Sequence, residues 1–145
     1  MILLAERLLS KLSRQEFGAR CLSIEQTDGL FASAVSLQSH YSWPNALSTL
    51  KHIRRCISPG GTFVLGTASD KLDIEQLLQN ASREHLMSPG WRRYCELNRE
   101  FASSSTGRFL SLDELIQEVR DAGFSVRSAR SDFYDHGLHC LVLEA

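Results

Sequence analysis

Two short apolar runs joined by an amphipathic helix constrain the fold of this chain more than any other feature. The first run covers residues 31–37, and the second, 62–65, follows a Pro59-Gly60-Gly61 turn signal. Asn45 is a candidate N-cap for the helix between them. That helix carries one apolar stripe, formed by Leu47, Leu50, Ile53 and Ile57. This order predicts a βαβ unit with two parallel strands and a helical crossover, and the continuous apolar character of the second run predicts a strand covered on both faces.

A parallel unit of this kind leaves a ligand crevice at the carboxyl ends of its strands. The polar and aromatic loop at 39–44 follows the first strand directly, so its side chains are expected at that crevice. His40 and Tyr41 are the candidate general bases there, because imidazole titrates near neutrality and a phenol can exchange a proton. The alternative for both residues is a structural hydrogen bond within the loop.

Further elements are predicted on both sides of this unit. Leucines recur at helical spacing in residues 1–14, and residues 20–25 alternate like a short strand. Residues 73–86 are predicted to be helical, and a second helix is expected after the Ser-Pro-Gly signal at 88–90. The stretch 71–107 then forms a helical insertion within a single domain spanning 1–145.

The C-terminal part predicts a helix followed by two strands. Ser111 begins a capping box with Glu114, and Gly123 marks the end of that helix. Residues 124–129 and 138–143 both have strand character, and the short connection between them indicates an antiparallel pair.

Composition narrows the classes of partner. The formal net charge of −1 gives no broad electrostatic reason to bind nucleic acid or an anionic membrane, and no apolar run approaches the ~20 residues that span a bilayer. The four cysteines are widely spaced, which favours reduced thiols in a cytoplasmic protein over a disulfide framework. Asp135, His136, His139 and Cys140 are local metal-ligand types, but their spacing matches no zinc signature, so no metal is expected.

The ordered motifs from Phe31 onward resemble the later half of class I S-adenosylmethionine-dependent methyltransferases. The resemblance rests on the strand ending at Ser36, the Trp43-Pro44 loop, the Pro59-Gly60-Gly61 turn with its following strand, and the last helix with Ala122-Gly123-Phe124. It implies a partial Rossmann-like α/β sheet, mostly parallel with an antiparallel C-terminal strand pair and helices on both faces. The implied cofactor is S-adenosylmethionine.

The sequence departs from that family in the motifs that bind the cofactor. It contains no Gly-x-Gly motif, and Ala32 stands where the family usually has an aspartate. We therefore interpret the chain as a truncated methyltransferase-like domain. A sheet without its usual neighbouring strands has an exposed edge, which predicts self-association or pairing with another chain.

The resemblance assigns roles to particular residues. It implies a cofactor-binding set after the third and fourth strands of the family sheet: Glu25, Gln26, Ser36, Leu37 and Gln38. His40 and Tyr41 follow as catalytic candidates that face the substrate. Trp43, Trp91 and Tyr94 are the candidate substrate-binding aromatics, although core packing explains all three as well.

Two functions from different classes follow. The first is methyl transfer to a small-molecule acceptor by in-line displacement, in which positioning of the acceptor supplies most of the catalytic effect. The alternative is a non-catalytic, methyltransferase-derived module that acts by protein–protein interaction.

Overall fold

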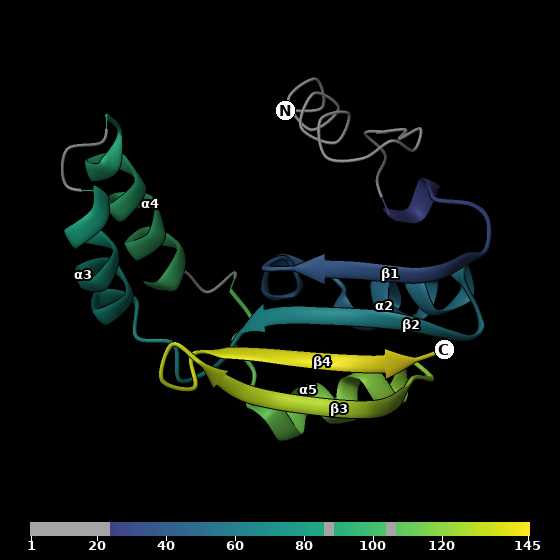
Figure 1. Cartoon of the computed structure of the whole chain (residues 1–145). Coiled ribbons are helices and arrows are strands. Elements are labelled where there is room, and N and C mark those ends of the chain that lie inside the picture. The colour runs from purple at the N-terminus through teal and green to yellow at the C-terminus, as the bar shows by residue number, and fades with distance from the viewer. Residues whose placement is uncertain (1–23, 86–88, 104–106) are drawn as a thin grey trace, which may run out of the picture.

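The computed structural model describes residues 24–85, 89–103 and 107–145, and a four-stranded mixed sheet lies at its centre (Figure 1). The strand order is β1-β2-β4-β3. β1 (Phe31–Leu37) and β2 (Ile57–Ala68) are parallel, whereas β4 (Leu138–Glu144) runs antiparallel to both β2 and β3 (Ser125–Phe133). The α/β fold with a parallel pair and an antiparallel C-terminal pair is therefore confirmed.

Helix α2 (Ala46–Cys56) is the crossover between the two parallel strands. The Asn45 side chain accepts a hydrogen bond from the Ser48 amide at 3.1 Å, which satisfies one of the free donors at the helix start. Leu50 and Ile53 from the predicted stripe are buried against the sheet. The βαβ prediction is confirmed in its order and its cap, but Ile57, expected on the apolar stripe of the helix, is the first residue of β2.

The Pro59-Gly60-Gly61 segment is a bulge within β2 rather than a turn before it. Phe31 lies opposite Ile57, but Ser33 already lies opposite Thr62, so the four residues 58–61 of β2 face the single residue Ala32 of β1. A Cβ atom on Gly61 would lie 2.7 Å from the Ala32 carbonyl oxygen. Because only a residue without a side chain fits there, the glycine allows the bulge to pack closely on β1.

Helix α5 (Leu112–Asp121) begins and ends as its sequence predicts. Both halves of the capping box form, since the Ser111 hydroxyl accepts from the Glu114 amide and the Glu114 carboxylate accepts from the Ser111 amide. Gly123 follows the helix with a φ of +95°, a conformation that favours glycine. Leu115 and Val119 are fully buried beneath the sheet.

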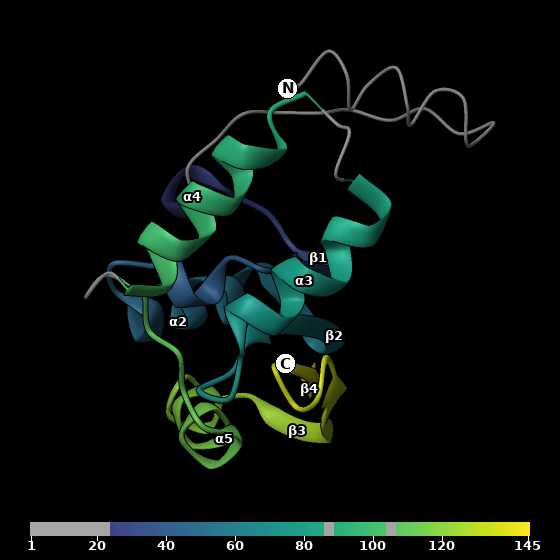
Figure 2. The ribbon, with the colours of Figure 1, turned by 90° about the vertical axis from the view of Figure 1, so that its left-hand side faces the viewer.

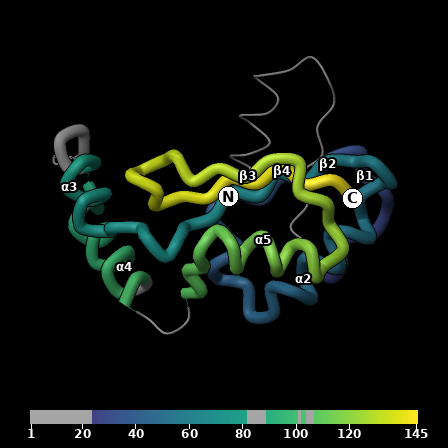
Figure 3. Tube along the Cα trace, turned by 90° about the horizontal axis from the view of Figure 1, so that it is seen from below, coloured from purple at the N-terminus to yellow at the C-terminus, as the bar shows by residue number. Residues whose placement is uncertain are grey.

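Helices α2 and α5 lie on the same face of the sheet (Figure 3). Phe63 and Leu65 of β2, with Leu141 of β4, point to these helices and form the core. On the opposite face, Val35 and Leu37 are 66% and 65% exposed. Within the described ranges no helix covers this second face. The sequence predicted that β2 is covered on both faces, and the described helices cover only one of them.

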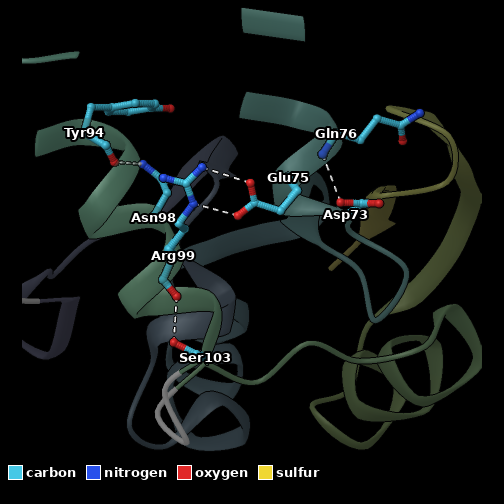
Figure 4. Close-up of polar contacts among 7 residues, drawn as sticks. All are labelled: Asp73, Glu75, Gln76, Tyr94, Asn98, Arg99 and Ser103. Atoms are coloured by element: carbon cyan, nitrogen blue, oxygen red, sulfur yellow. Dashed lines mark hydrogen bonds and ion pairs between the residues drawn. The ribbon is translucent and has the colours of Figure 1, made fainter. Parts of the chain in front are cut away.

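Helices α3 (Ile74–His85) and α4 (Trp91–Ser103) form a pair beyond one end of the sheet (Figures 1 and 2). The Arg99 guanidinium of α4 donates to both carboxylate oxygens of Glu75 on α3, at 2.6 and 2.9 Å (Figure 4). Asp73 accepts from the Gln76 amide at 2.9 Å at the start of α3. Both helices predicted within 71–107 are confirmed.

The two elements predicted before β1 are not confirmed. The helix expected at 1–14 lies outside the described residues. The strand expected at 20–25 is wrong where it can be compared, because Ile24–Gln26 form a 3₁₀ turn, η1. The Thr27 amide donates to the Ile24 carbonyl at 3.1 Å, and the partly buried Ile24 side chain packs against the core from this tight turn. None of the described helices is long and apolar enough to cross a membrane.

Candidate functional site

A cavity of about 370 Å³ lies at the carboxyl ends of the two parallel strands. Gln38 directly follows β1, and Ala68 is the last residue of β2. Helices α3 and α4 and the β3–β4 hairpin complete the walls. The lining residues are Gln38, Tyr41, Ala68, Leu72, Ile74, Leu77, Leu78, Ala81, Tyr94, Asn98, Phe109, Tyr134 and Leu138. A cavity therefore occupies the place where the βαβ unit predicts a ligand crevice.

Aromatic rings shape two sides of this cavity. The Tyr41 ring stacks on Phe109, with centroids 5.7 Å apart and planes 28° apart. The Tyr94 ring stacks on Trp91 at 5.3 Å and 25°. The Asn98 amide donates to the Tyr94 carbonyl at 2.8 Å, which fixes the Asn98 side chain along α4 (Figure 4). Flat apolar surfaces thus face the cavity together with a small number of polar groups.

The turn between β3 and β4 closes the cavity with a strained backbone. Tyr134, Asp135 and His136 are consecutive non-glycine residues with φ values of 49°, 53° and 68°. The Ser69 hydroxyl donates to the His136 carbonyl at 2.6 Å, and the Gly137 amide donates to the Tyr134 carbonyl at 3.0 Å. Such left-handed residues persist only where surrounding contacts hold them, and here they place Tyr134 in the cavity wall.

His40 is buried away from this cavity. It belongs to the short 3₁₀ helix η2 (His40–Ser42), and its Nε2 lies 2.9 Å from a Glu118 carboxylate oxygen on α5. The second Glu118 oxygen accepts from the Arg108 guanidinium at 3.0 Å. The Trp43 ring meets the imidazole edge-on, with centroids 5.2 Å apart. The structure therefore places His40 in a polar network that ties the loop after β1 to α5.

Burial is the main influence on the charge state of His40. It lowers the pKa of the imidazole below its ordinary value, and the nearby Glu118 carboxylate only partly opposes this effect. The neutral ring then donates through Nε2–H to Glu118. The buried Nδ1 has no hydrogen-bond partner among the described residues, which suits an unprotonated acceptor better than a donor.

This network positions Tyr41, the residue next to His40. The Arg108 amide donates to the Tyr41 carbonyl at 2.8 Å, so the Arg108 residue contacts both Tyr41 and Glu118. Sequence reasoning missed Glu118 and Arg108. Glu118 lies 78 residues from His40 and shows only helical spacing in the sequence, so no local pattern could have paired them.

The residues expected at the site separate into several places. Gln38, Tyr41 and Tyr94 lie together in the cavity. Ser36 and Trp43 instead line a second cavity of about 500 Å³ between β1 and α2.

The remaining expected residues lie elsewhere. Leu37 is exposed on the uncovered sheet face. Glu25 and Gln26 lie in η1, and Trp91 lies behind Tyr94 at the start of α4. Across the part of the chain that the structure describes, no cluster of three His, Cys, Asp or Glu side chains could hold a metal ion.

Comparison with known proteins shows similarity at the level of the fold. No protein-family model matches the sequence, and no curated protein matches it. Solved structures do match. One is the complex between the Haloferax volcanii Trm112 methyltransferase activator and the putative methyltransferase, at 19% identity and a TM-score of 0.53, covering 81% of this chain and 55% of that chain.

Two further matches are also methyltransferases. The mitomycin 7-O-methyltransferase matches at 11% identity with a TM-score of 0.59, covering 98% of this chain and 37% of that chain. The magnesium protoporphyrin IX methyltransferase from Synechocystis PCC 6803, with bound SAH, matches at 10% identity with a TM-score of 0.52, covering 85% and 48%. This chain thus spans between about a third and a little over half of the length of these proteins, and it has their class I methyltransferase fold.

Proposed function

We propose, starting from the class I methyltransferase fold, that this chain forms the acceptor-binding part of an S-adenosylmethionine-dependent methyltransferase for small molecules. The observation that carries the proposal is the position of the 370 Å³ cavity. It lies at the carboxyl edge of the parallel pair β1 and β2, where open α/β sheets bind their ligands. Its size is within the range of small-molecule sites.

The lining of the cavity indicates the class of acceptor. Aliphatic side chains from α3, among them Leu77 and Leu78, line the cavity together with Tyr41 and Tyr94. Gln38 and Asn98 are the amide groups in the same lining. A flat, largely apolar molecule with one or two polar substituents fits these walls. Trp91 supports this role indirectly, because its ring backs that of Tyr94.

Tyr41 is the proposed catalytic residue. S-adenosylmethionine, when bound, supplies a methyl group on a sulfonium, and the protein has to hold the acceptor atom in line with it. Tyr41 lines the cavity directly after the strand end and can orient an acceptor hydroxyl or amine. His40, the other candidate base, acts as a positioning residue in this proposal, because its imidazole is bound to Glu118 outside the cavity.

The chain offers one wall of a cofactor site. Gln38 lines the cavity directly after the end of β1, and Ser36 and Leu37 are the last two residues of that strand. Glu25 and Gln26 belong to η1, which precedes the start of β1. The Ser36 and Ser39 hydroxyls lie 2.6 Å apart and bond to each other. Within the described residues the far side of β1 carries no second wall. Tight cofactor binding therefore depends on additional polypeptide.

The alternative function is a non-catalytic module that binds another protein. It is favoured by the short span of this chain relative to its structural neighbours and by the exposed apolar residues on β1. One neighbour is a complex with a methyltransferase activator, so a protein partner suits this fold. The described cysteines Cys56, Cys95 and Cys140 are unpaired with one another, which supports a cytoplasmic location for either function.

The test measures binding of a small flat phenol, 1-naphthol, and of S-adenosylhomocysteine by isothermal titration to the full chain. We expect 1-naphthol to bind wild type and the Leu97→Ala control, whose side chain is 46% exposed on α4 and absent from the cavity lining. Leu77→Trp fills the cavity and is expected to weaken binding at least tenfold. Equal binding by all three proteins, or by none, would refute the acceptor site. Binding heat with S-adenosylhomocysteine at micromolar concentration would contradict the proposal that this chain forms only one side of the cofactor site.

A further inference from the structure

Two smaller cavities adjoin the proposed acceptor cavity. One, of about 180 Å³, shares the lining residues Leu72, Ile74 and Phe109 with it. The other, of about 80 Å³, shares Leu77 and Tyr134 with it. A molecule in the acceptor cavity therefore has both smaller spaces as direct neighbours, and the side chains that line them act on it.

Every charged residue that lines these three cavities is an aspartate. Asp70 lines the larger side cavity, and Asp73 and Asp135 line the smaller one. Among the described residues that line any of the three, there is no lysine, arginine or histidine. Lys71, which follows Asp70 in the chain, is exposed and is not part of the lining. The charge around a bound acceptor is thus of one sign.

No cation within the described ranges pairs with these aspartates. The ion pairs formed there join glutamates to Arg93, Arg99, Arg108 and Arg127, and Glu118 to His40. The three negative charges beside the cavities are therefore not used in an ion pair of that part of the fold, and a charged group of a ligand has them as partners.

Local contacts hold the backbone at each aspartate. The Asp70 amide donates to the Leu110 carbonyl at 3.2 Å. The Asp73 carboxylate accepts from the Gln76 amide at 2.9 Å at the start of α3 (Figure 4). Asp135 lies in the left-handed turn that precedes β4. Because three separate elements supply these residues, the negative charge lies around the acceptor cavity rather than at one point of its rim.

Aromatic residues of the acceptor cavity favour the same kind of ligand. Its lining contains Tyr41, Tyr94, Phe109 and Tyr134. The faces of aromatic rings attract cations, and the attraction grows when the cation is shielded from water. No three metal-ligand side chains come together among the described residues, so these groups do not fit a bare metal ion. They fit an organic cation that also has a flat apolar part.

We propose that the acceptor is a flat organic cation, with a positively charged nitrogen attached to an apolar ring. The ring occupies the acceptor cavity, and the charged nitrogen lies at one of the aspartate-lined side cavities. The charged nitrogen is not the reacting atom, because a protonated amine has no lone pair for the methyl group. This inference rests on the proposed acceptor site and specifies the class of molecule that the site takes.

The probes are two naphthalene compounds that differ in one group. 1-Naphthylmethylamine carries an ammonium group where 1-naphthalenemethanol carries a hydroxyl, and 1-naphthoate carries a negative charge. Isothermal titration to the full chain should show that the amine binds about fivefold more tightly than the alcohol, since several exposed carboxylates and the aromatic rings each contribute modestly. The naphthoate should bind more weakly than the alcohol. Added sodium chloride should reduce the preference for the amine, because salt screens exposed charges.

A triple variant, Asp70→Asn with Asp73→Asn and Asp135→Asn, removes the charges and keeps the side-chain size. Asparagine retains a capping oxygen at residue 73 and tolerates the left-handed backbone at residue 135. The variant should bind the amine and the alcohol within about twofold of each other, because only the aromatic attraction remains. Asp28→Asn removes an exposed charge before β1, at the end of the strand away from the cavity, and should keep the wild-type preference.

The outcomes separate this inference from the acceptor site itself. If wild type binds the alcohol but does not prefer the amine, the inference is overturned and the acceptor site stands. If wild type binds no naphthalene compound, both are overturned. An undiminished preference in the triple variant, a preference lost in Asp28→Asn, or amine binding unchanged in Leu77→Trp would also overturn the inference. If circular dichroism shows that the triple variant does not fold, the wild-type preference and its decrease with salt decide.

Discussion

Val35 and Val64 are direct register partners in the parallel pair β1 and β2. They come from the two apolar runs that define the βαβ unit, so this one pairing joins the sequence pattern to the observed sheet. Val64 also lies opposite Val142 of β4, which makes β2 the centre of the sheet and leaves β1 at its edge. The position of the proposed acceptor cavity follows from that arrangement.

Gly61→Ala should destabilise the chain through the bulge in β2. A new Cβ would lie 2.6 Å from the Ile57 side chain and 2.7 Å from the Ala32 carbonyl oxygen, and the backbone oxygen cannot move without disturbing β1. Overpacking of this kind typically costs about 1–3 kcal/mol. Urea unfolding measures the loss. Ser58→Ala in the same bulge is the control and should unfold near the wild-type midpoint; an equal loss in both variants would argue against the close approach.

Asn45→Ala should weaken the crossover helix α2 at its first turn. It removes the side-chain acceptor for the Ser48 amide, and loss of an N-cap typically costs about 1 kcal/mol. Asn45→Asp keeps an acceptor oxygen in the same place and should retain most of the stability. Thermal unfolding of the three proteins gives the comparison, and an aspartate variant as unstable as the alanine variant would show that the cap is not the cause.

The buried His40 should make stability depend on pH. Because its pKa is lowered in the folded state from an ordinary value of 6.5, the unfolded chain binds a proton that the folded chain does not. The free energy of unfolding should therefore fall as the pH drops below about 6.5 toward the folded pKa, and this contribution should stay constant above that range.

His40→Gln removes this titration and should flatten the pH dependence between pH 5 and 7.5. It also loses the buried contact with Glu118, which typically costs about 1–3 kcal/mol at neutral pH. Urea midpoints at several pH values measure both effects. Leu97→Ala, an exposed change, should keep the wild-type slope. A His40→Gln variant with that same slope would show that His40 contributes no such titration.

Local signals in the sequence predicted most of the secondary structure. The Asn45 cap, the Ser111–Glu114 capping box and the stop at Gly123 each depend on neighbouring residues, so they could be identified without tertiary contacts. The apolar runs of β1 and β2 were also sufficient to predict a parallel pair. The bulge at Gly61 was not predicted, because Pro-Gly-Gly indicates a turn wherever it occurs and only the approach of Ala32 shows how it is used.

The site was predicted less completely than the fold. Tyr41 could be placed near a strand end from the βαβ order, whereas Gln38 was expected at the site only through the resemblance to methyltransferases. The hydrogen-bond network of His40, Glu118 and Arg108 joins residues far apart in the chain, and its geometry depends on how α5 packs beneath the sheet. The left-handed turn that places Tyr134 in the cavity wall likewise depends on a distant contact with Ser69.

The parallel pair β1 and β2, on which the acceptor cavity depends, is tested most directly by residue-resolved amide hydrogen exchange on the full chain. The Gln38 amide donates to the Gly66 carbonyl of β2, so the alternating backbone predicts that Ala34, Ser36 and Gln38 exchange slowly and that Val35 and Leu37 exchange rapidly. Slow exchange at all five amides would show that the outer edge of β1 is covered. Rapid exchange at all five would show that β1 does not pair with β2, and the account of the acceptor cavity would then be wrong.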